Sequence, residues 1–205
     1  MRFSEQHEVN RPEGSDWFDA NVEMDSPLYV DPLLLFEDED PAWEGAHEEI
    51  LDFFDATLEL LKQAQGHRDS MHWAKAKRFL QFPELREFAL GMSMGHPEGS
   101  GIGPELALEM CEGLEFFRER GRGSDDQLLA MIAVLVPGIG VDRISDMVCN
   151  ILKGRFIAYT QEICRGLGIS LEEVAVANPG GPTGADGCRA RWRCRSARSS
   201  AAECC

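Results

Sequence analysis

Residues 137–150 read PGIGVDRISDMVCN, and this stretch decides the course of the C-terminal half of the chain. The glycines on either side of Ile139 predict a tight turn, because glycine adopts backbone conformations that other residues avoid. After the turn, apolar residues recur at three- and four-residue steps, which predicts one helix over residues 141–166, on the order of 39 Å long at about 1.5 Å per residue. Its predicted buried face consists of Ile144, Val148, Ile151, Leu152, Phe156, Tyr159 and Ile163.

Helical spacing also extends through the segments that precede this turn. We predict helices over residues 41–66, 70–80, 84–92 and 104–119 and, after a capping Ser124, a helix that includes residues 128–136. The buried face of the first consists of Trp43, Ala46, Ile50, Phe53, Phe54, Thr57, Leu58 and Leu61. Before it, the run LYVDPLLLF at residues 28–36 has a proline in its middle, which excludes a regular central strand. We expect this run to be an extended segment, with Asp31 capping the turn that follows.

These elements predict an all-α fold, an irregular bundle of about six helices with an extended N-terminal segment and no sheet. Residues 1–26 are polar and acidic without periodicity and are predicted to be a flexible leader. Residues 27–170 form the helical domain. Residues 171–205 are predicted to be a disordered low-complexity tail, because most residues from 178 onward are Arg, Ala, Ser, Cys, Gly or Pro. All six types have GC-rich codons, so we favour translation in a shifted frame, with the native frame continuing past Ser170.

The composition limits where the protein works and what it binds. A formal net charge of −16 repels nucleic acid at long range, so contact with a phosphate backbone requires a local basic patch or a partner subunit. The N-terminus has no signal peptide, and the longest apolar run, residues 128–136, is far shorter than the roughly 20 residues that span a membrane. We therefore expect a cytoplasmic protein without a membrane partner. Cys111, Cys149 and Cys164 occur singly, as buried free thiols do.

The first turns of the helix after the glycine turn carry a polar stripe, Asp142, Ser145, Asp146 and Asn150. Helical residues four apart lie about 5 to 6 Å from each other, so two carboxylates there could share a divalent cation in a metal-dependent nuclease or hydrolase. The alternative is a solvent-facing stripe, in which the helix dipole favours the aspartates and Arg143 pairs with Asp146. We favour this alternative and expect no cofactor.

The turn itself resembles the helix-hairpin-helix motif of DNA-binding proteins, an apolar helix followed by Pro-Gly-apolar-Gly and a second helix. The resemblance implies that backbone N–H groups at Gly138 and Gly140 approach a phosphate, with Arg143 nearby. The chain departs from the motif after the turn, because Val141 and Asp142 stand where Lys or Arg is usual. A tight turn between two buried helices requires the same glycines for conformational reasons alone.

A wider resemblance involves VDPLLLF, EEILDFF, FPELREFALGMS, GSGIG and GIGVDRISDMVCNILKGRFIAYTQ, across about residues 27–170. In this combination the chain resembles the N-terminal part of longer bacterial proteins encoded near restriction and phage-defence genes. The resemblance implies a fragment whose partner is another protein or a C-terminal domain, and it assigns no catalytic residue. The leading hypothesis is a helical interaction or regulatory module without catalysis of its own. Nucleic-acid binding through the PGIG turn and a metal-dependent nuclease or hydrolase are the alternatives.

Overall fold

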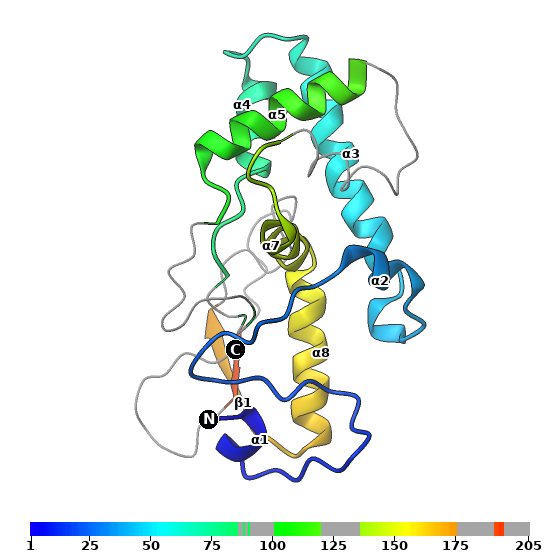
Figure 1. Ribbon diagram of the computed structural model, residues 1–205, viewed down its shortest axis with the longest axis vertical. Helices are drawn as coiled ribbons and strands as arrows, with labels where there is room; N and C mark the ends of the chain where they lie inside the picture. Colours follow the sequence, from blue (N-terminus) through cyan, green and yellow to red (C-terminus); the bar gives the residue numbers. More distant parts are fainter. Residues whose placement is uncertain (86–87, 89, 91–100, 120–135, 176–190, 195–205) are drawn as a thin grey trace.

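The computed structural model describes residues 1–85, 88, 90, 101–119, 136–175 and 191–194, and this part is mostly helical (Figure 1). The helices are α1 (Phe3–Gln6), α2 (Pro32–Glu37), the short 3-10 helix η1 (Pro41–Trp43), α3 (Ala46–Ala64), α4 (Met71–Phe79), α5 (Pro104–Glu119), α7 (Val141–Ile151) and α8 (Lys153–Gly166). The predicted all-α fold class is therefore confirmed. The helix predicted over residues 128–136 lies outside the described residues except for Val136.

Helix α3 is the centre of the core, and α4 and α5 lie side by side across one end of it (Figure 1). The predicted buried face of α3 is confirmed from Ala46 to Leu61, and the Phe53 ring contacts those of Phe54, Phe79 and Phe82 at centroid distances of 5.2, 6.2 and 5.5 Å. The predicted start at Pro41 is wrong. Gly45 has a φ of +75°, a left-handed conformation that separates η1 from α3.

The single long helix predicted over residues 141–166 is also wrong, because α7 ends at Ile151 and α8 begins at Lys153. In Figure 1, α7 is seen nearly end-on while α8 runs along the long axis, so the chain turns sharply between them. Leu152, fully buried, takes φ −89° and ψ 14° at the junction. Gly154 lies in the first turn of α8, and glycine weakens a helix by about 1 kcal/mol relative to alanine, which disfavours one continuous helix here.

Two of the shorter predictions need correction. The run predicted as extended contains helix α2, whose start combines Pro32 in the first turn with the capping role expected of Asp31: the Leu33 N–H donates to Asp31 Oδ1 at 2.9 Å. The helix predicted over residues 84–92 is wrong for its described members 84, 85, 88 and 90, which are not helical. The chain there is held instead by an antiparallel bridge in which Phe82 and Ile102 exchange backbone hydrogen bonds of 3.1 and 2.7 Å.

The N-terminal leader, which the sequence predicts to be flexible, has defined local packing. Trp17 is buried, and its ring meets that of Phe3 edge-on at 5.8 Å. Asp19 accepts hydrogen bonds from the Ser4 backbone N–H at 2.8 Å and from the Ser4 hydroxyl at 2.7 Å. A single tryptophan and these local hydrogen bonds leave no periodic pattern for sequence reasoning to detect.

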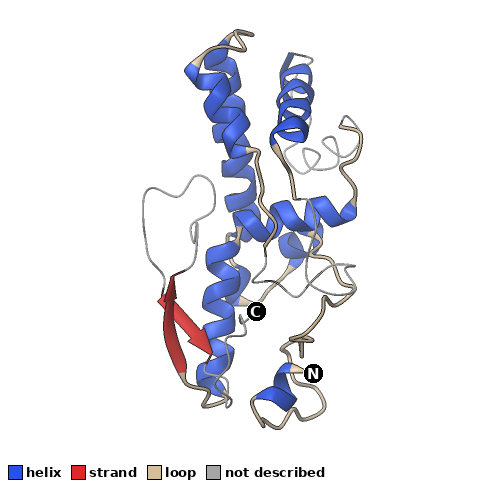
Figure 2. Cartoon of the chain, turned by 90° about the vertical axis from the view of Figure 1, so that its left-hand side faces the viewer, coloured by secondary structure: helices blue, strands red, loops and turns tan. Residues whose placement is uncertain are grey.

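A two-stranded antiparallel sheet, which the sequence did not predict, pairs β1 (Leu171–Ala175) with β2 (Arg191–Cys194) beside α8 (Figure 2). Leu171 stands opposite Cys194, and Glu172 opposite Arg193. The rest of the predicted disordered tail lies outside the described residues. No helix in the described part is long and apolar enough to span a membrane.

Candidate functional site

A side chain of α7, that of Arg143, closes the turn that precedes this helix. Gly138 has a φ of +89°, so the predicted need for glycine is met at this position. Val136 and Ile139 are buried on either side of it. The Arg143 guanidinium donates a hydrogen bond to the Gly138 carbonyl, and a Cβ on Gly138 would lie 3.1 Å from Arg143 Nη1. Arg143 therefore stabilises the turn and is not paired with Asp146 as the sequence suggested.

The polar stripe of α7 does not face solvent as a unit. Ser145 and Asn150 are both buried. The Ser145 hydroxyl oxygen accepts a hydrogen bond from the Val30 N–H at 2.9 Å, and Asn150 Nδ2 donates to the Pro83 carbonyl at 3.0 Å and to the Asp146 carbonyl at 2.9 Å. These two side chains attach the N-terminal segment and the chain around Phe82 to α7, so the solvent-facing interpretation is wrong for them.

Asp146 is the half-buried member of a group of carboxylates. Its pKa is raised from 3.8 to about 7, mainly by burial and also by the negative charges of Glu84, Asp142 and Asp25, while Arg143 opposes the rise. Asp142 itself is exposed. The carboxylates belong to three different segments, the N-terminal segment, the chain around Phe82 and α7, so sequence spacing alone could not bring them together.

The described residues contain no group of three or more His, Cys, Asp or Glu side chains placed to hold a metal ion. Of the predicted stripe, Asp142 and Asp146 keep carboxylates, while the Asn150 amide and the Ser145 hydroxyl are engaged with backbone groups. The buried thiols predicted at Cys111, Cys149 and Cys164 are confirmed, and burial raises the pKa of Cys111 and of Cys149 to about 12. Thiols with such high pKa values are protonated at neutral pH and are poor nucleophiles.

A family model described as a domain of unknown function, DUF8370, matches residues 8–183. The chain belongs to this family. The match includes α2 to α8, and with them the turn, the polar stripe and the carboxylates of the DUF8370 domain. Neither the curated proteins nor the solved structures gave a match to the chain.

The DUF8370 domain also has a feature that sequence reasoning missed, an exposed apolar segment consisting of Leu28, Tyr29, Leu33 and Leu34. Pro32 is buried and Leu35 packs against the core, which leaves Leu33 and Leu34 on the outer side of α2, exposed by 58% and 65%. The Val30 N–H to Ser145 hydrogen bond and the Asp31 cap hold this segment in place. The signal for this helix in the sequence was Asp31-Pro32, a pair that favours the start of a helix.

Proposed function

We propose that the DUF8370 domain is a protein-interaction module that has no catalysis of its own and binds its partner through the exposed apolar segment. The observation that carries this proposal is the exposure of Leu33 and Leu34 on a short, capped helix. Burying a leucine side chain contributes about 1.5 to 3 kcal/mol, so contact with these two leucines supplies a useful share of a binding free energy. Large exposed apolar residues that lie together commonly mark interaction surfaces.

The polar stripe supports the same proposal from a different side. Ser145 and Asn150, two of the four residues considered for chemistry, hold other segments of the chain onto α7. Arg143 is engaged by the turn that it follows. The polar stripe therefore positions the N-terminal segment, and α2 follows Val30 directly in that segment.

No observation favours either alternative function to the same degree. Nucleic-acid binding through Gly138 and Gly140 would bring a phosphate next to the exposed Asp142, and metal-dependent hydrolysis would rest on Asp142, Asp146 and Asn150 with few free ligands. The proposal that the partner belongs to a bacterial defence or restriction system rests on the sequence resemblance alone.

Purification of the tagged chain from the cells that produce it tests the proposal. The wild type is compared with Leu33→Ser/Leu34→Ser and with the control Met71→Ser, which removes an apolar side chain that is 85% exposed on α4, away from α2. We expect a stoichiometric partner with the wild type and the control and none with the double variant. A monomer by light scattering with all three, or a partner that the double variant retains, contradicts the proposal.

A further inference from the structure

The stretch of sequence that contains the exposed apolar segment carries charge of one sign. Residues 12–61 contain no lysine and no arginine, although the chain has 20 of them, and this stretch includes α2, η1 and almost all of α3. Acidic residues recur throughout the same stretch. In the sequence, Leu33 and Leu34 are thus flanked by acidic residues and by no basic ones. The cation that the structure brings to this stretch from α8, Arg155, is engaged by Glu49 and by the Ala42 and Glu44 carbonyls.

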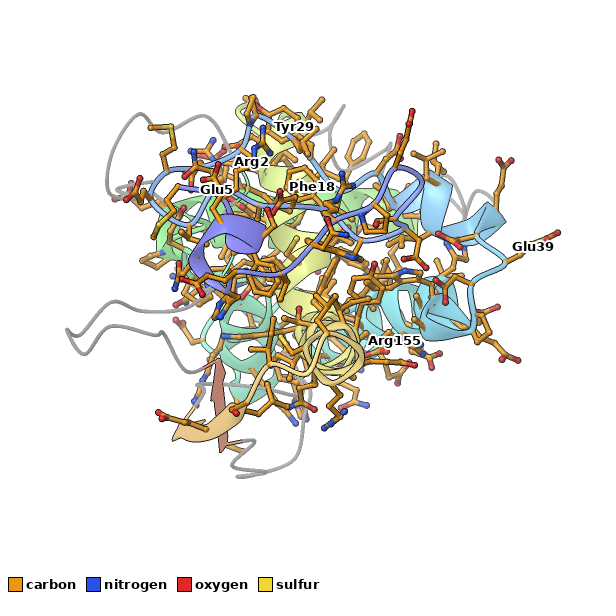
Figure 3. The ribbon with its side chains drawn as sticks, turned by 90° about the horizontal axis from the view of Figure 1, so that it is seen from below. Arg2, Glu5, Phe18, Tyr29, Glu39 and Arg155 are labelled. Atoms are coloured by element: carbon orange, nitrogen blue, oxygen red, sulfur yellow. The ribbon has the colours of Figure 1, made fainter. Side chains whose placement is uncertain are left out.

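The carboxylates nearest to these leucines in the sequence are exposed, and no cationic side chain of the described residues pairs with them. They are Asp31, Glu37, Asp38, Glu39 and Asp40. Three of them cap backbone N–H groups, those of Leu33, Asp40 and Ala42 in turn, and none forms a salt bridge with another described residue. Figure 3 shows Glu39 projecting away from the body of the protein. We call these five residues the acidic rim of α2.

We propose that the partner of this surface is a cationic amphipathic segment of another protein, which seats apolar side chains on Leu33 and Leu34 and directs lysines or arginines to the acidic rim. This inference rests on the proposed function and adds the chemistry of the partner. Opposite charge around an apolar contact accelerates association and selects against wrong partners. An amphipathic helix with a basic face is the common form of such a segment.

The acidic rim disfavours the other occupants that this surface might have. Nucleic acid and an anionic membrane surface are repelled by it, and a second copy of the chain would bring the same charges into contact. The arginine-rich tail of this chain is engaged elsewhere in its described part, since Arg191–Cys194 forms strand β2 against β1. A cationic segment from a different protein satisfies both the leucines and the carboxylates.

Binding of synthetic peptides to the full chain tests the proposal by fluorescence anisotropy. The probe is a labelled helical peptide of about 18 residues made of leucine and lysine, with the leucines on one face. One control peptide has the same composition in scrambled order, and another has glutamate in place of lysine. We expect binding of the patterned Leu-Lys peptide, about tenfold weaker binding of the scrambled peptide and none of the Leu-Glu peptide, with affinity falling as salt increases to about 0.15 M.

Two matched triple variants locate the charge effect. Glu37→Gln/Asp38→Asn/Glu39→Gln neutralises part of the rim. It leaves the caps at Asp31 and Asp40 unchanged, and asparagine at residue 38 keeps an oxygen that can accept from the Asp40 N–H. The control Asp69→Asn/Glu109→Gln/Glu119→Gln makes the same change in net charge away from α2. We expect the first to weaken binding about tenfold or more and the second by less than about twofold. Equal losses in both variants, or no binding of the Leu-Lys peptide, overturn the inference.

The Leu33→Ser/Leu34→Ser and Met71→Ser variants separate this inference from the proposed function. Loss of the natural partner in the leucine variant, together with no specific effect of neutralising the rim, keeps the interaction module and refutes a cationic partner. Retention of the natural partner by the leucine variant refutes the proposed function instead. Circular dichroism spectra and unchanged melting temperatures verify that every variant is folded.

Discussion

Substitution of Asp146 by asparagine should stabilise the protein at high pH and leave its stability nearly unchanged at low pH. Burial, reinforced by Glu84 and Asp142, raises the pKa of Asp146 from 3.8 to about 7 in the folded state. Above pH 7 the carboxylate is ionised in both states, and the folded state bears the cost of its burial. A tenfold difference in proton affinity corresponds to about 1.4 kcal/mol, so the full shift corresponds to about 4 kcal/mol. Water reaches this half-buried carboxylate and screens it, so we expect a gain in the free energy of unfolding of between about 1 and 4 kcal/mol.

The sign follows from the number of protons bound. Between about pH 4 and pH 7 the folded state keeps a proton on Asp146 that the unfolded state has lost, so this group lowers the free energy of unfolding as the pH rises. Asp146→Asn removes the titration and keeps the shape of the side chain. Its advantage over the wild type should therefore grow from near zero at pH 4 to its full value at pH 8.

Urea unfolding followed by circular dichroism at pH 4, 6 and 8 measures this difference. The control is Asp69→Asn, which changes an exposed carboxylate in the turn between α3 and α4 and should show no such pH-dependent gain. An Asp146→Asn variant that is less stable than the wild type at pH 8, or equally shifted at all three pH values, would refute the reasoning. Either result would mean that the carboxylate is stabilised in the fold rather than penalised.

Three further predictions concern the turn and the polar stripe. Ser145→Ala leaves the Val30 N–H without its acceptor and should lower the free energy of unfolding by about 1 to 3 kcal/mol in urea titrations, whereas the exposed Ser170→Ala should change it by less than about 0.5 kcal/mol. Wild-type protein should give no electrophoretic shift of duplex DNA at low salt, because Arg143 is bound to Gly138 and the exposed Asp142 repels a phosphate. A salt-dependent shift that Gly138→Ala and Gly140→Ala abolish would instead establish a DNA-binding hairpin. Calorimetry with Mg²⁺ or Mn²⁺ should give no binding heat, because Asn150 and Ser145 are committed to backbone groups, and heat that Asp146→Ala removes would restore the metal hypothesis.

Sequence periodicity predicted those elements whose buried face is long and continuous. The α3 face from Ala46 to Leu61 was predicted residue by residue, because a half-buried helix repeats its apolar positions every three or four residues. Local capping chemistry was equally readable at Asp31, whose carboxylate accepts a hydrogen bond from the Leu33 N–H at 2.9 Å.

The remaining features depend on contacts between segments far apart in the chain. The apolar pattern of residues 141–166 continues across Leu152, so periodicity alone could not reveal that the helix turns there. Ser145 and Asn150 look like solvent-facing polar residues until Val30 and Pro83 supply their partners. The pKa of Asp146 is raised mainly by burial and also by Glu84 and Asp25, and no local pattern connects these distant residues to it.

The hydrogen bond from Val30 to Ser145 joins residues that are 115 positions apart, and this separation has a consequence for the order of folding. During synthesis at about 5 to 20 residues per second, Ser145 is added on the order of 10 s after Val30. Throughout that interval the segment that carries Leu33 and Leu34 has no α7 on which to dock. Closing so long a loop also costs more chain entropy than closing a short one, so we expect this contact to form late in folding. The outer leucines of α2 are therefore made early and fixed in position late, so a partner that recognises only the docked segment distinguishes finished chains from nascent ones.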